Sequence, residues 1–194
     1  MRIAAVVLAA GRGRRAGGPK ALLSIAGETF LERAAALLLR PGVGPLVAVL
    51  GHEAERVRGA ARLPAGAIVA VNEAYDEGML GSVLVGLRAA QDAGADAVLV
   101  HPVDHPLVAP ETVDRVVAAL LAGAVIAVPS HAGRRGHPGG FARAAWPALR
   151  EASPAVGARE VLAAHPEWIT HVAGDPGCVA GIDTPGDYAR LLGG

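Results

Sequence analysis

Short, continuously apolar runs recur along the chain, separated by longer segments in which apolar positions repeat at helical spacing. The runs cover residues 3–9, 46–50, 67–71, 97–100 and 125–128 and consist mainly of Val, Ile, Leu and Ala. Because they do not alternate with polar residues, they are typical of strands that are covered on both faces. The helical patterns fall between them, at residues 30–39, 53–61, 83–93 and 111–121.

This alternation of strand and helix predicts the fold class. It indicates an α/β protein, a three-layer αβα sandwich with a mostly parallel, Rossmann-like sheet between the helices. After Pro129 the alternation gives way to a segment rich in Gly, Pro and Arg, SHAGRRGHPGGF, then to two short helical segments and a last helix after Pro185. We interpret this late region as an addition to the sheet. Finding no repeat and no linker, we expect residues 1–194 to form one domain.

Composition restricts the classes of partner. Lys plus Arg and Asp plus Glu both number 18, so no net charge attracts the protein to nucleic acid or to an anionic membrane. Aromatic residues make up 3% of the chain, too few for base-stacking platforms. Cys178 is the single cysteine, which excludes an internal disulfide and a cysteine-based metal site. We expect no nucleic-acid partner, no membrane association, no secretory signal and a cytoplasmic protein.

Polar clusters follow three of the predicted strands. They lie at residues 11–20, at residues 72–82 and around Asp104. The carboxyl ends of parallel strands share one edge of a sheet, and ligands of open α/β folds bind at that edge. We therefore predict that the three clusters form one site.

The first cluster, GRGRRAGGPK at residues 11–20, matches two phosphate-binding patterns incompletely. GRGRRA satisfies the dinucleotide pattern GxGxxA, but the Gly-Gly-Pro that follows would interrupt the helix on which that pattern depends. A P-loop is excluded because Pro19 precedes Lys20 and Ala21 replaces the metal-binding Ser or Thr. A flexible loop with basic side chains remains, which we interpret as a binding site for a triphosphate. The alternative is a solvated basic turn.

Several motifs together resemble one enzyme family. LAAGRGRRAGGPK, at residues 8–20, is similar to the LAAGx[SG]xR[ML]GxPK signature of nucleotidyltransferases with a GT-A-like fold. NEAYDEGMLGSVLVGL, RRGHPGGF, GAREVL and GIDTPGDYARL follow in the order typical of the molybdenum cofactor cytidylyltransferase branch of these MobA-like enzymes. The resemblance covers nearly the whole chain. It implies transfer of CMP from CTP to the phosphate of a molybdopterin-type acceptor with release of pyrophosphate, and transient contact with a molybdoenzyme.

The resemblance also implies roles for individual residues around the nucleotide. Arg15 and Lys20 would hold the triphosphate and act in catalysis, whereas Arg12 and Arg14 would face solvent. Asp104 would be catalytic and would bind Mg²⁺ together with Asp183. The nucleotide-binding positions are Leu8, Ala9, Ala10, Gly11, Gly13, Asn72, Gly78, Met79 and Ser82, the last in a segment expected to be a loop.

The acceptor site is assigned in the same way. Its implied residues are Arg135, Gly136, His137 and Pro138, assisted by residues 157–159. The chain departs from the family pattern at Gly13, Ala16, Gly81, Gly181 and Gly186. Gly181 replaces an acidic residue and leaves Asp183 without a neighbouring carboxylate, and Asp183 is equally suited to cap a turn.

Alternatives follow from these departures. Three alternative functions remain: a guanylyltransferase that uses GTP, a cytidylyltransferase for a sugar or polyol phosphate, and a non-catalytic module that holds a cofactor. A nicotinamide or flavin oxidoreductase is a fourth. His101, Asp104 and His105 offer transition-metal ligands. The prolines around them disfavour a ligand-presenting helix, so we expect the histidines to be structural or to lie outside the metal's own ligands.

Overall fold

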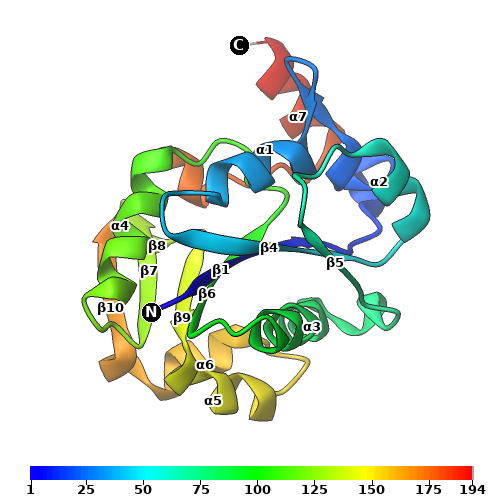
Figure 1. Ribbon diagram of the computed structural model, residues 1–194. Coiled ribbons are helices and arrows are strands. Elements are labelled where there is room, and N and C mark those ends of the chain that lie inside the picture. Colours follow the sequence, from blue (N-terminus) through cyan, green and yellow to red (C-terminus); the bar gives the residue numbers. More distant parts are fainter. Residues whose placement is uncertain (194) are drawn as a thin grey trace.

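The computed structural model describes residues 1–193, which form an eight-stranded sheet with helices on both faces (Figure 1). The strands are β1 (Ile3–Ala9), β4 (Val43–Leu50), β5 (Ile68–Val71), β6 (Ala97–Pro102), β7 (Ile126–His131), β8 (Arg134–Arg135), β9 (Gly139–Ala142) and β10 (Ile169–Ala173). Their order is β10-β7-β9-β6-β1-β4-β5, and β8 pairs with β7. All five predicted strands are present, and the predicted α/β fold is confirmed.

Most of the strand pairs are parallel, as the apolar runs predict. β1 lies between β4 and β6, β5 extends this group at one edge, and β10 pairs in parallel with β7. Two strands are exceptions: β9 runs antiparallel between β6 and β7, and the short β8 pairs antiparallel with β7. β9 lies in the Gly-rich segment that the sequence does not mark as a strand. A Cβ atom at Gly140 would lie 2.9 Å from the side chains of Leu120 and Val116, so glycine lets the helix above approach the backbone.

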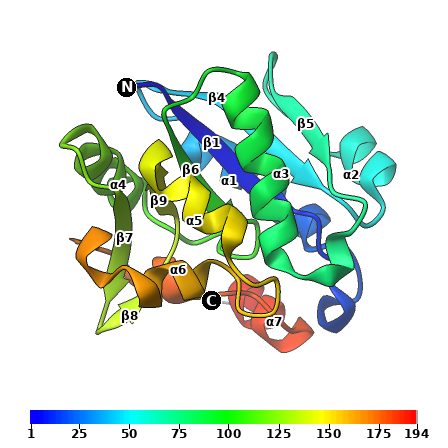
Figure 2. The same cartoon turned by 90° about the horizontal axis from the view of Figure 1, so that it is seen from below.

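Helices cover the two faces of the sheet. The helices are α1 (Phe30–Leu38), α2 (Ala54–Ala60), α3 (Met79–Asp92), α4 (Pro110–Leu121), α5 (Trp146–Glu151), α6 (Ala158–Ala164) and α7 (Pro185–Gly193). Helices α1, α2 and α4 lie over one face, and α3, α5 and α6 lie over the other, as the view from below shows (Figure 2). None of the helices in residues 1–193 is both long and apolar enough to cross a membrane.

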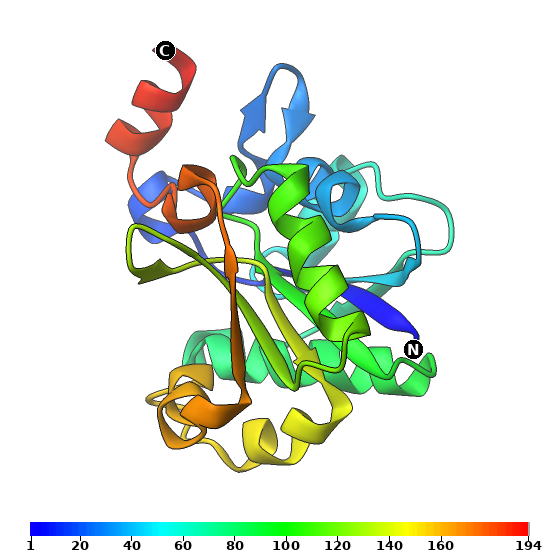
Figure 3. The ribbon, with the colours of Figure 1, turned by 90° about the vertical axis from the view of Figure 1, so that its left-hand side faces the viewer.

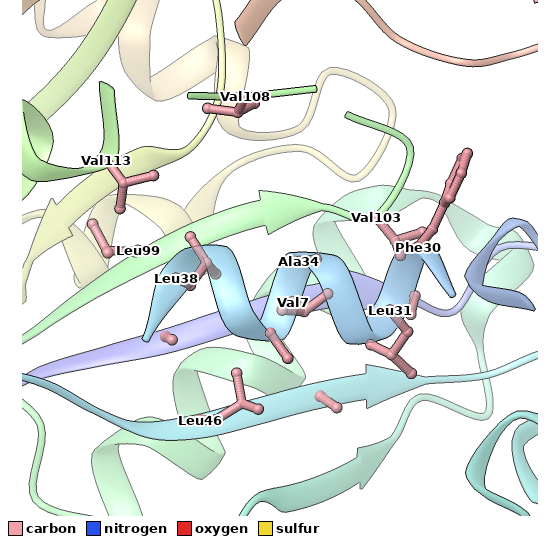
Figure 4. Packing of buried hydrophobic residues seen from close by; sticks show 14 of the residues in the cluster. Val7, Phe30, Leu31, Ala34, Leu38, Leu46, Leu99, Val103, Val108 and Val113 are labelled. Carbon is pink, nitrogen blue, oxygen red and sulfur yellow. The ribbon is translucent and has the colours of Figure 1, made fainter. Parts of the chain in front are cut away.

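Successive residues of β1 point into two separate cores. Val7 belongs to the core beneath α1 and α4, where Phe30 and Leu38 are fully buried (Figure 4). Val6 belongs to the core on the opposite face, together with Trp146 of α5. Because side chains of a strand alternate between faces, an uninterrupted apolar run is needed to fill both cores. Both faces of the sheet are therefore packed against helices, and the loops at its carboxyl edge remain available to form a site.

The start of α3 differs from the prediction. The pattern predicts a helix from residue 83, but α3 begins at Met79, directly after Gly78. Ser82 thus lies in the first turn of the helix, and the expectation that it belongs to a loop is wrong. Glycines at 78 and 81 weaken the helical signal in the sequence, because glycine is an unfavourable helix residue. Ser82 is buried and anchored instead of freely exposed.

Several short elements complete the fold. They are the 3-10 helices at Arg14–Ala16, Lys20–Leu22, Tyr75–Glu77, Arg143–Ala145, Pro166–Trp168 and Pro176–Val179, and the hairpin of β2 (Ser24–Ile25) and β3 (Glu28–Thr29). Helix α7 and this hairpin project side by side from the same end of the molecule (Figure 3). The Tyr188 hydroxyl joins them, because it donates to Ser24 O at 2.7 Å and accepts from Ser24 N at 3.2 Å.

Candidate active site

The three polar clusters meet at the carboxyl edge of the sheet, where Lys20 lies between two carboxylates. Its Nζ atom is 2.9 Å from Asp104 Oδ2 and 2.7 Å from Asp183 Oδ1. Arg15 approaches the same Asp183 oxygen, with Nη2 at 3.4 Å. The side chain of Lys20 is only 15% exposed, so the ion pairs form in a partly dehydrated setting where charges interact strongly.

A tight turn directs Lys20 toward these carboxylates. Gly13 has the left-handed φ of 60°, and its carbonyl oxygen accepts from Ala16 N at 2.8 Å and from Gly18 N at 3.3 Å. A Cβ atom at Gly13 would lie 1.8 Å from Gly18 O, so the turn requires glycine. The loop contains a single 3-10 turn, Arg14–Ala16, where a dinucleotide site needs an α-helix.

Asp104 is held ionised by two donors. Its Oδ1 lies 3.0 Å from His105 Nδ1, while Oδ2 accepts from Lys20. Burial raises the pKa of Asp104, but the hydrogen bonds and charges of His105 and Lys20 outweigh it and hold the pKa well below its ordinary value. The backbone oxygen of Asp104 accepts from Ile182 N at 2.8 Å, which ties the segment that carries Asp183 to the end of β6.

The carboxylate of Asp183 pairs with Lys20 and Arg15 and does not cap a turn. Thr184 and Asp187 form the reciprocal cap at the start of α7: Asp187 Oδ2 accepts from Thr184 N at 2.8 Å and Thr184 Oγ1 accepts from Asp187 N at 3.1 Å. Asp187 Oδ2 also accepts from Asp183 N at 3.2 Å. The capping role that the sequence left open for Asp183 is thus performed by its neighbours.

The two carboxylates fit a divalent cation. Asp104 and Asp183 converge on one cationic atom, the arrangement that Mg²⁺ uses when one or two carboxylates and substrate phosphates supply its oxygen ligands. No third carboxylate within residues 1–193 joins them, because position 181, where the family pattern has an acidic residue, is glycine. Within residues 1–193, no group of three or more His, Cys, Asp or Glu side chains is arranged to hold a metal ion by itself.

Beside Asp104 lies a pocket of about 130 Å³, here called the nucleotide pocket. Its lining residues are Leu8, Ala10, Gly11, Tyr75, Met79, Ser82, Pro102, Val103 and Asp104. Asn72 supports its wall from behind, because Nδ2 donates to Ser82 Oγ at 3.0 Å and Oδ1 accepts from Ala74 N at 3.1 Å. Ala9 is buried in the core, Gly13 shapes the loop, and Gly78 lines the neighbouring cavity, so these three predicted positions lie outside the nucleotide pocket.

The motifs of the sequence did not indicate that Tyr75 lines the nucleotide pocket, and the expectation that Arg12 faces solvent is wrong. Arg12, expected to face solvent, places Nη2 at 3.1 Å from Asp76 Oδ2 and its guanidinium carbon 5.3 Å from the Tyr75 ring centroid. The Tyr75 hydroxyl lies 3.3 Å from His52 Nδ1. A signal existed in the sequence, because Tyr75 is one of only two tyrosines and lies inside the second polar cluster. Arg14 is exposed as expected.

A second, larger cavity of about 640 Å³ adjoins the nucleotide pocket, and we call it the acceptor cavity. The two spaces share the side chains of Leu8, Met79 and Pro102 as a common wall. Arg135, Gly136 and His137 line the acceptor cavity together with residues 157–159, whereas Pro138 is buried and does not. Three of the four predicted acceptor residues therefore line the space next to the nucleotide pocket.

Three histidines lie close to one another near Asp104, and of these only His137 lines the cavity. The ring centroids of His105 and His137 are 4.7 Å apart, and that of His101, in β6, is 6.5 Å from that of His105. Burial, with a smaller contribution from nearby charges including Arg159, lowers the pKa of His137 to about 4. His101 is fully buried, both of its ring nitrogens are without a hydrogen-bond partner within residues 1–193, and burial lowers its pKa to about 3. At neutral pH both imidazoles are uncharged.

The model of the MobA-like NTP transferase domain matches residues 5–168 of the chain. The chain belongs to this family. It is a nucleotidyltransferase of the MobA-like kind, and the motifs quoted above lie largely inside the matched range.

Relatives of similar sequence are named for several different activities. Nicotine blue oxidoreductase of Paenarthrobacter nicotinovorans is 34% identical, over 98% of this chain and 96% of its own length. Molybdenum cofactor guanylyltransferase of Cereibacter sphaeroides is 36% identical, over 76% of this chain and 70% of its own length. From the same organism, 2-C-methyl-D-erythritol 4-phosphate cytidylyltransferase is 37% identical, over 98% and 95% of the two chains.

A solved structure covers the whole chain. Rv0371c of Mycobacterium tuberculosis H37Rv aligns with a TM-score of 0.84 and 30% identity over 100% of both chains. A second crystal structure of Rv0371c, in complex with manganese, aligns with a TM-score of 0.77 and 31% identity over 100% of this chain and 99% of its own. The likeness includes the late region, from β8 to α7, which the family model covers only in part.

Proposed function

We propose that the protein transfers CMP from CTP to the phosphate of a molybdopterin-type acceptor and releases pyrophosphate. The observation that carries this proposal is the convergence of Lys20, Asp104 and Asp183 beside a nucleotide pocket that shares a wall with a second, larger cavity. Nucleotidyl transfer needs these parts: cations for a triphosphate, carboxylates for a divalent cation, and a neighbouring place for the acceptor.

The chemistry is a displacement at the α-phosphorus of CTP. An oxygen of the acceptor phosphate forms the new P–O bond, and the bond between the α-phosphorus and the bridging oxygen to the β-phosphate breaks, so that pyrophosphate leaves. A phosphate oxygen is already ionised, so no side chain has to remove a proton from it. Lys20 and Arg15 would neutralise charge on the triphosphate and on the departing pyrophosphate, and amides of the 11–20 loop would orient it.

A divalent cation, Mg²⁺ in this proposal, would be held by Asp104 and Asp183 and would supply further charge neutralisation at the phosphates. The manganese complex of Rv0371c supports a divalent cation in this family. Asp104 is suited to the role because its lowered pKa keeps it anionic throughout the neutral range.

We name CTP because the motifs at residues 72–87, 134–141, 157–162 and 181–191 resemble the cytidylyltransferase branch of the family. Ala10 and Tyr75 lie in the walls of the nucleotide pocket, where the base would bind. The guanylyltransferase and the methylerythritol phosphate cytidylyltransferase among the relatives make GTP and another phosphate acceptor the natural comparisons.

Release of pyrophosphate tests the proposal. The purified protein is incubated with CTP, Mg²⁺ and a phosphorylated pterin, and Lys20→Ala and Asp104→Ala are compared with Arg14→Ala, a change in the same loop at an exposed position. We expect the first two changes to lower the rate by about a hundredfold or more, because each removes a charge that contacts the reacting phosphates, and Arg14→Ala to have little effect. Ligand binding without any release would instead support a non-catalytic carrier, and equal rates in all variants would refute the assigned roles.

A second candidate function rests on the relative named nicotine blue oxidoreductase, which matches this chain over nearly its full length. It predicts that the protein binds a nicotinamide or flavin cofactor. The missing α-helix after Gly13 argues against a dinucleotide site of the usual kind. A rise in melting temperature with NADPH or FAD, together with none for CTP, would favour the oxidoreductase.

A further inference from the structure

The acceptor cavity has an unusual distribution of polar groups. Its lining consists of Gly, Ala, Val, Leu, Met, Pro and Phe, with three exceptions: Arg135, His137 and Arg159. Among the described residues that line it, none is Asp, Glu, Asn, Gln, Ser, Thr or Tyr. A ligand inside therefore meets cationic or imidazole groups and apolar surface, but no side chain that accepts a hydrogen bond as a carboxylate, amide or hydroxyl does.

The basic groups and the apolar groups occupy different parts of the cavity. Arg135 and Arg159 are exposed at the rim, and His137 lies between the cavity and His105, which contacts Asp104. The floor consists of buried side chains, among them Val83 and Phe141. The anionic end of a ligand would therefore bind at the rim, beside His137 and on the side nearest Asp104. The rest of the ligand would cover the apolar floor.

This lining discriminates between two classes of phosphate ester. The hydroxyl groups of a polyol or sugar phosphate lose their hydrogen bonds to water in the cavity and find no side-chain oxygen in return, which opposes binding. The faces of an aromatic ring gain from each apolar contact and have no such cost, and a hydrocarbon ring has none at its edge either. The volume of the acceptor cavity, about 640 Å³, is sufficient for a ring system of the size of a small drug molecule.

We propose that the acceptor cavity recognises the phosphate monoester of a flat aromatic ring system by its shape and charge, without any side chain that reads the hydrogen-bonding edge of the ring. Arg159 joins Arg135 and His137 in binding the phosphate. The site thus takes simple aryl phosphates that lack the polar edge of a pterin and rejects polyol phosphates. The reaction at this phosphate rests on the function proposed above, but the choice of ligand rests on the cavity alone.

Binding to the unmodified protein is the primary test. 1-Naphthyl phosphate and glycerol 3-phosphate carry the same phosphate monoester on an aromatic and on a hydroxylated body, and each is titrated calorimetrically into the full chain. We expect 1-naphthyl phosphate to bind at least about tenfold more tightly, the equivalent of burying a small apolar surface. Glycerol 3-phosphate that binds equally well or better would overturn the inference.

Paired arginine variants test the phosphate position. Arg159→Gln removes a cation from the cavity rim, whereas Arg134→Gln removes one from β8 whose Nη2 instead donates to Val179 O at 3.3 Å and does not line the cavity. We expect Arg159→Gln to weaken 1-naphthyl phosphate by about tenfold, the size of a lost charge-assisted hydrogen bond, and Arg134→Gln to leave it unchanged. Equal effects of the two changes would overturn the assignment of Arg159. Arg159→Lys, which keeps the charge, should retain most of the affinity.

A turnover assay separates this inference from the proposed function. If 1-naphthyl phosphate binds as expected but CTP and Mg²⁺ yield no pyrophosphate with it or with any pterin phosphate, the cavity assignment holds and nucleotidyl transfer fails. If pyrophosphate is released with glycerol 3-phosphate and not with 1-naphthyl phosphate, nucleotidyl transfer holds and the cavity assignment fails.

Discussion

The conformation of Gly13 determines the shape of the loop at residues 11–20. Gly13→Ala introduces a Cβ at 1.8 Å from Gly18 O, whereas Gly17→Ala has the same kind of left-handed φ, 83°, and open space around it. Both changes cost about 1–2 kcal/mol of backbone strain, but only the first displaces the loop. We expect Gly13→Ala to weaken CTP binding by at least about tenfold and Gly17→Ala to weaken it much less, as measured by calorimetry. Equal affinities in the two variants would show that the turn does not shape the site.

Lys20 illustrates how far single residues are predictable from this sequence. Its signature loop and the position of Asp104 after a parallel strand imply that the two side chains meet, and the 2.9 Å ion pair confirms that prediction. Arg12 was less predictable. A run of arginines beside glycines has the same composition whether it is solvated or folded back, so nothing local distinguishes the pairing of Arg12 with Asp76 from the exposure of Arg14. Only the position of the 3-10 turn at Tyr75–Glu77 decides it.

His101 makes stability depend on pH. Its pKa of about 3 in the folded protein lies below the ordinary value of 6.5, so between these values the unfolded chain binds a proton that the folded chain does not. The free energy of unfolding therefore falls as the pH is lowered through this window, by about 1.4 kcal/mol per pH unit for this group, and is unaffected above it. The groups that face His101, namely His105, His137 and Asp104, modify the curve but do not reverse it.

Chemical denaturation between pH 4 and pH 7 measures this effect. We expect His101→Phe to flatten the acid limb of the stability curve, because phenylalanine cannot bind a proton. His171→Gln, at an exposed position of β10, should leave the limb unchanged. An unchanged slope in His101→Phe would mean that His101 is not the proton-binding group.

At the scale of elements, the regular part of the sheet is predictable and the late part is not. Both faces of β1 and β6, and of most of β4 and β7, are buried, so these strands are apolar runs that are visible in the sequence. β9 is a glycine-rich strand because α4 packs against its backbone, so it lacks the side chains by which strands are recognised. β10 lies at the edge of the sheet with exposed residues and is equally inconspicuous. The acceptor cavity depends on this late region, and only the family resemblance indicated the residues that line it.

Helix α7 positions Asp183 although it has no buried residue of its own. It is held by the Tyr188 hydroxyl, which bonds to Ser24 in the hairpin that follows Lys20. Tyr188→Phe removes these two hydrogen bonds but keeps the ring against Phe30, where the centroids are 6.0 Å apart. We expect the Mg²⁺ concentration for half-maximal activity to rise by roughly threefold to tenfold, with the maximal rate little changed.

The control for this prediction is Arg88→Gln, which removes an exposed ion pair on α3, away from the site. It should change neither the Mg²⁺ requirement nor the rate, because exposed pairs contribute little. If Tyr188→Phe lowers the maximal rate and leaves the Mg²⁺ requirement unchanged, α7 does not act through Asp183.

At the scale of the whole molecule, the site consists of segments from both ends of the chain. Lys20 and Asp183 are 163 positions apart and meet because β1 and the segment after β10 reach the same edge of the sheet. The parallel-sheet rule predicts this edge from the sequence. It does not predict the widths of the two cavities, which depend on how far α3 and α6 stand from the sheet and on the shared wall at Met79.

Because the ligand contacts residues from the whole chain, it must stabilise the whole fold. CTP with Mg²⁺ at about a hundred times its Kd should add about 2.7 kcal/mol to the free energy of unfolding by mass action. For a chain of this length that corresponds to a rise of about 5–10 °C in melting temperature. Because we propose CTP as the substrate, GTP at the same concentration should give a smaller rise. Asp104→Asn should abolish the part of the rise that requires Mg²⁺. A larger rise with GTP than with CTP would assign the protein to guanylyl transfer, because the nucleotide that binds the folded state more tightly is the one that the pocket is built to hold.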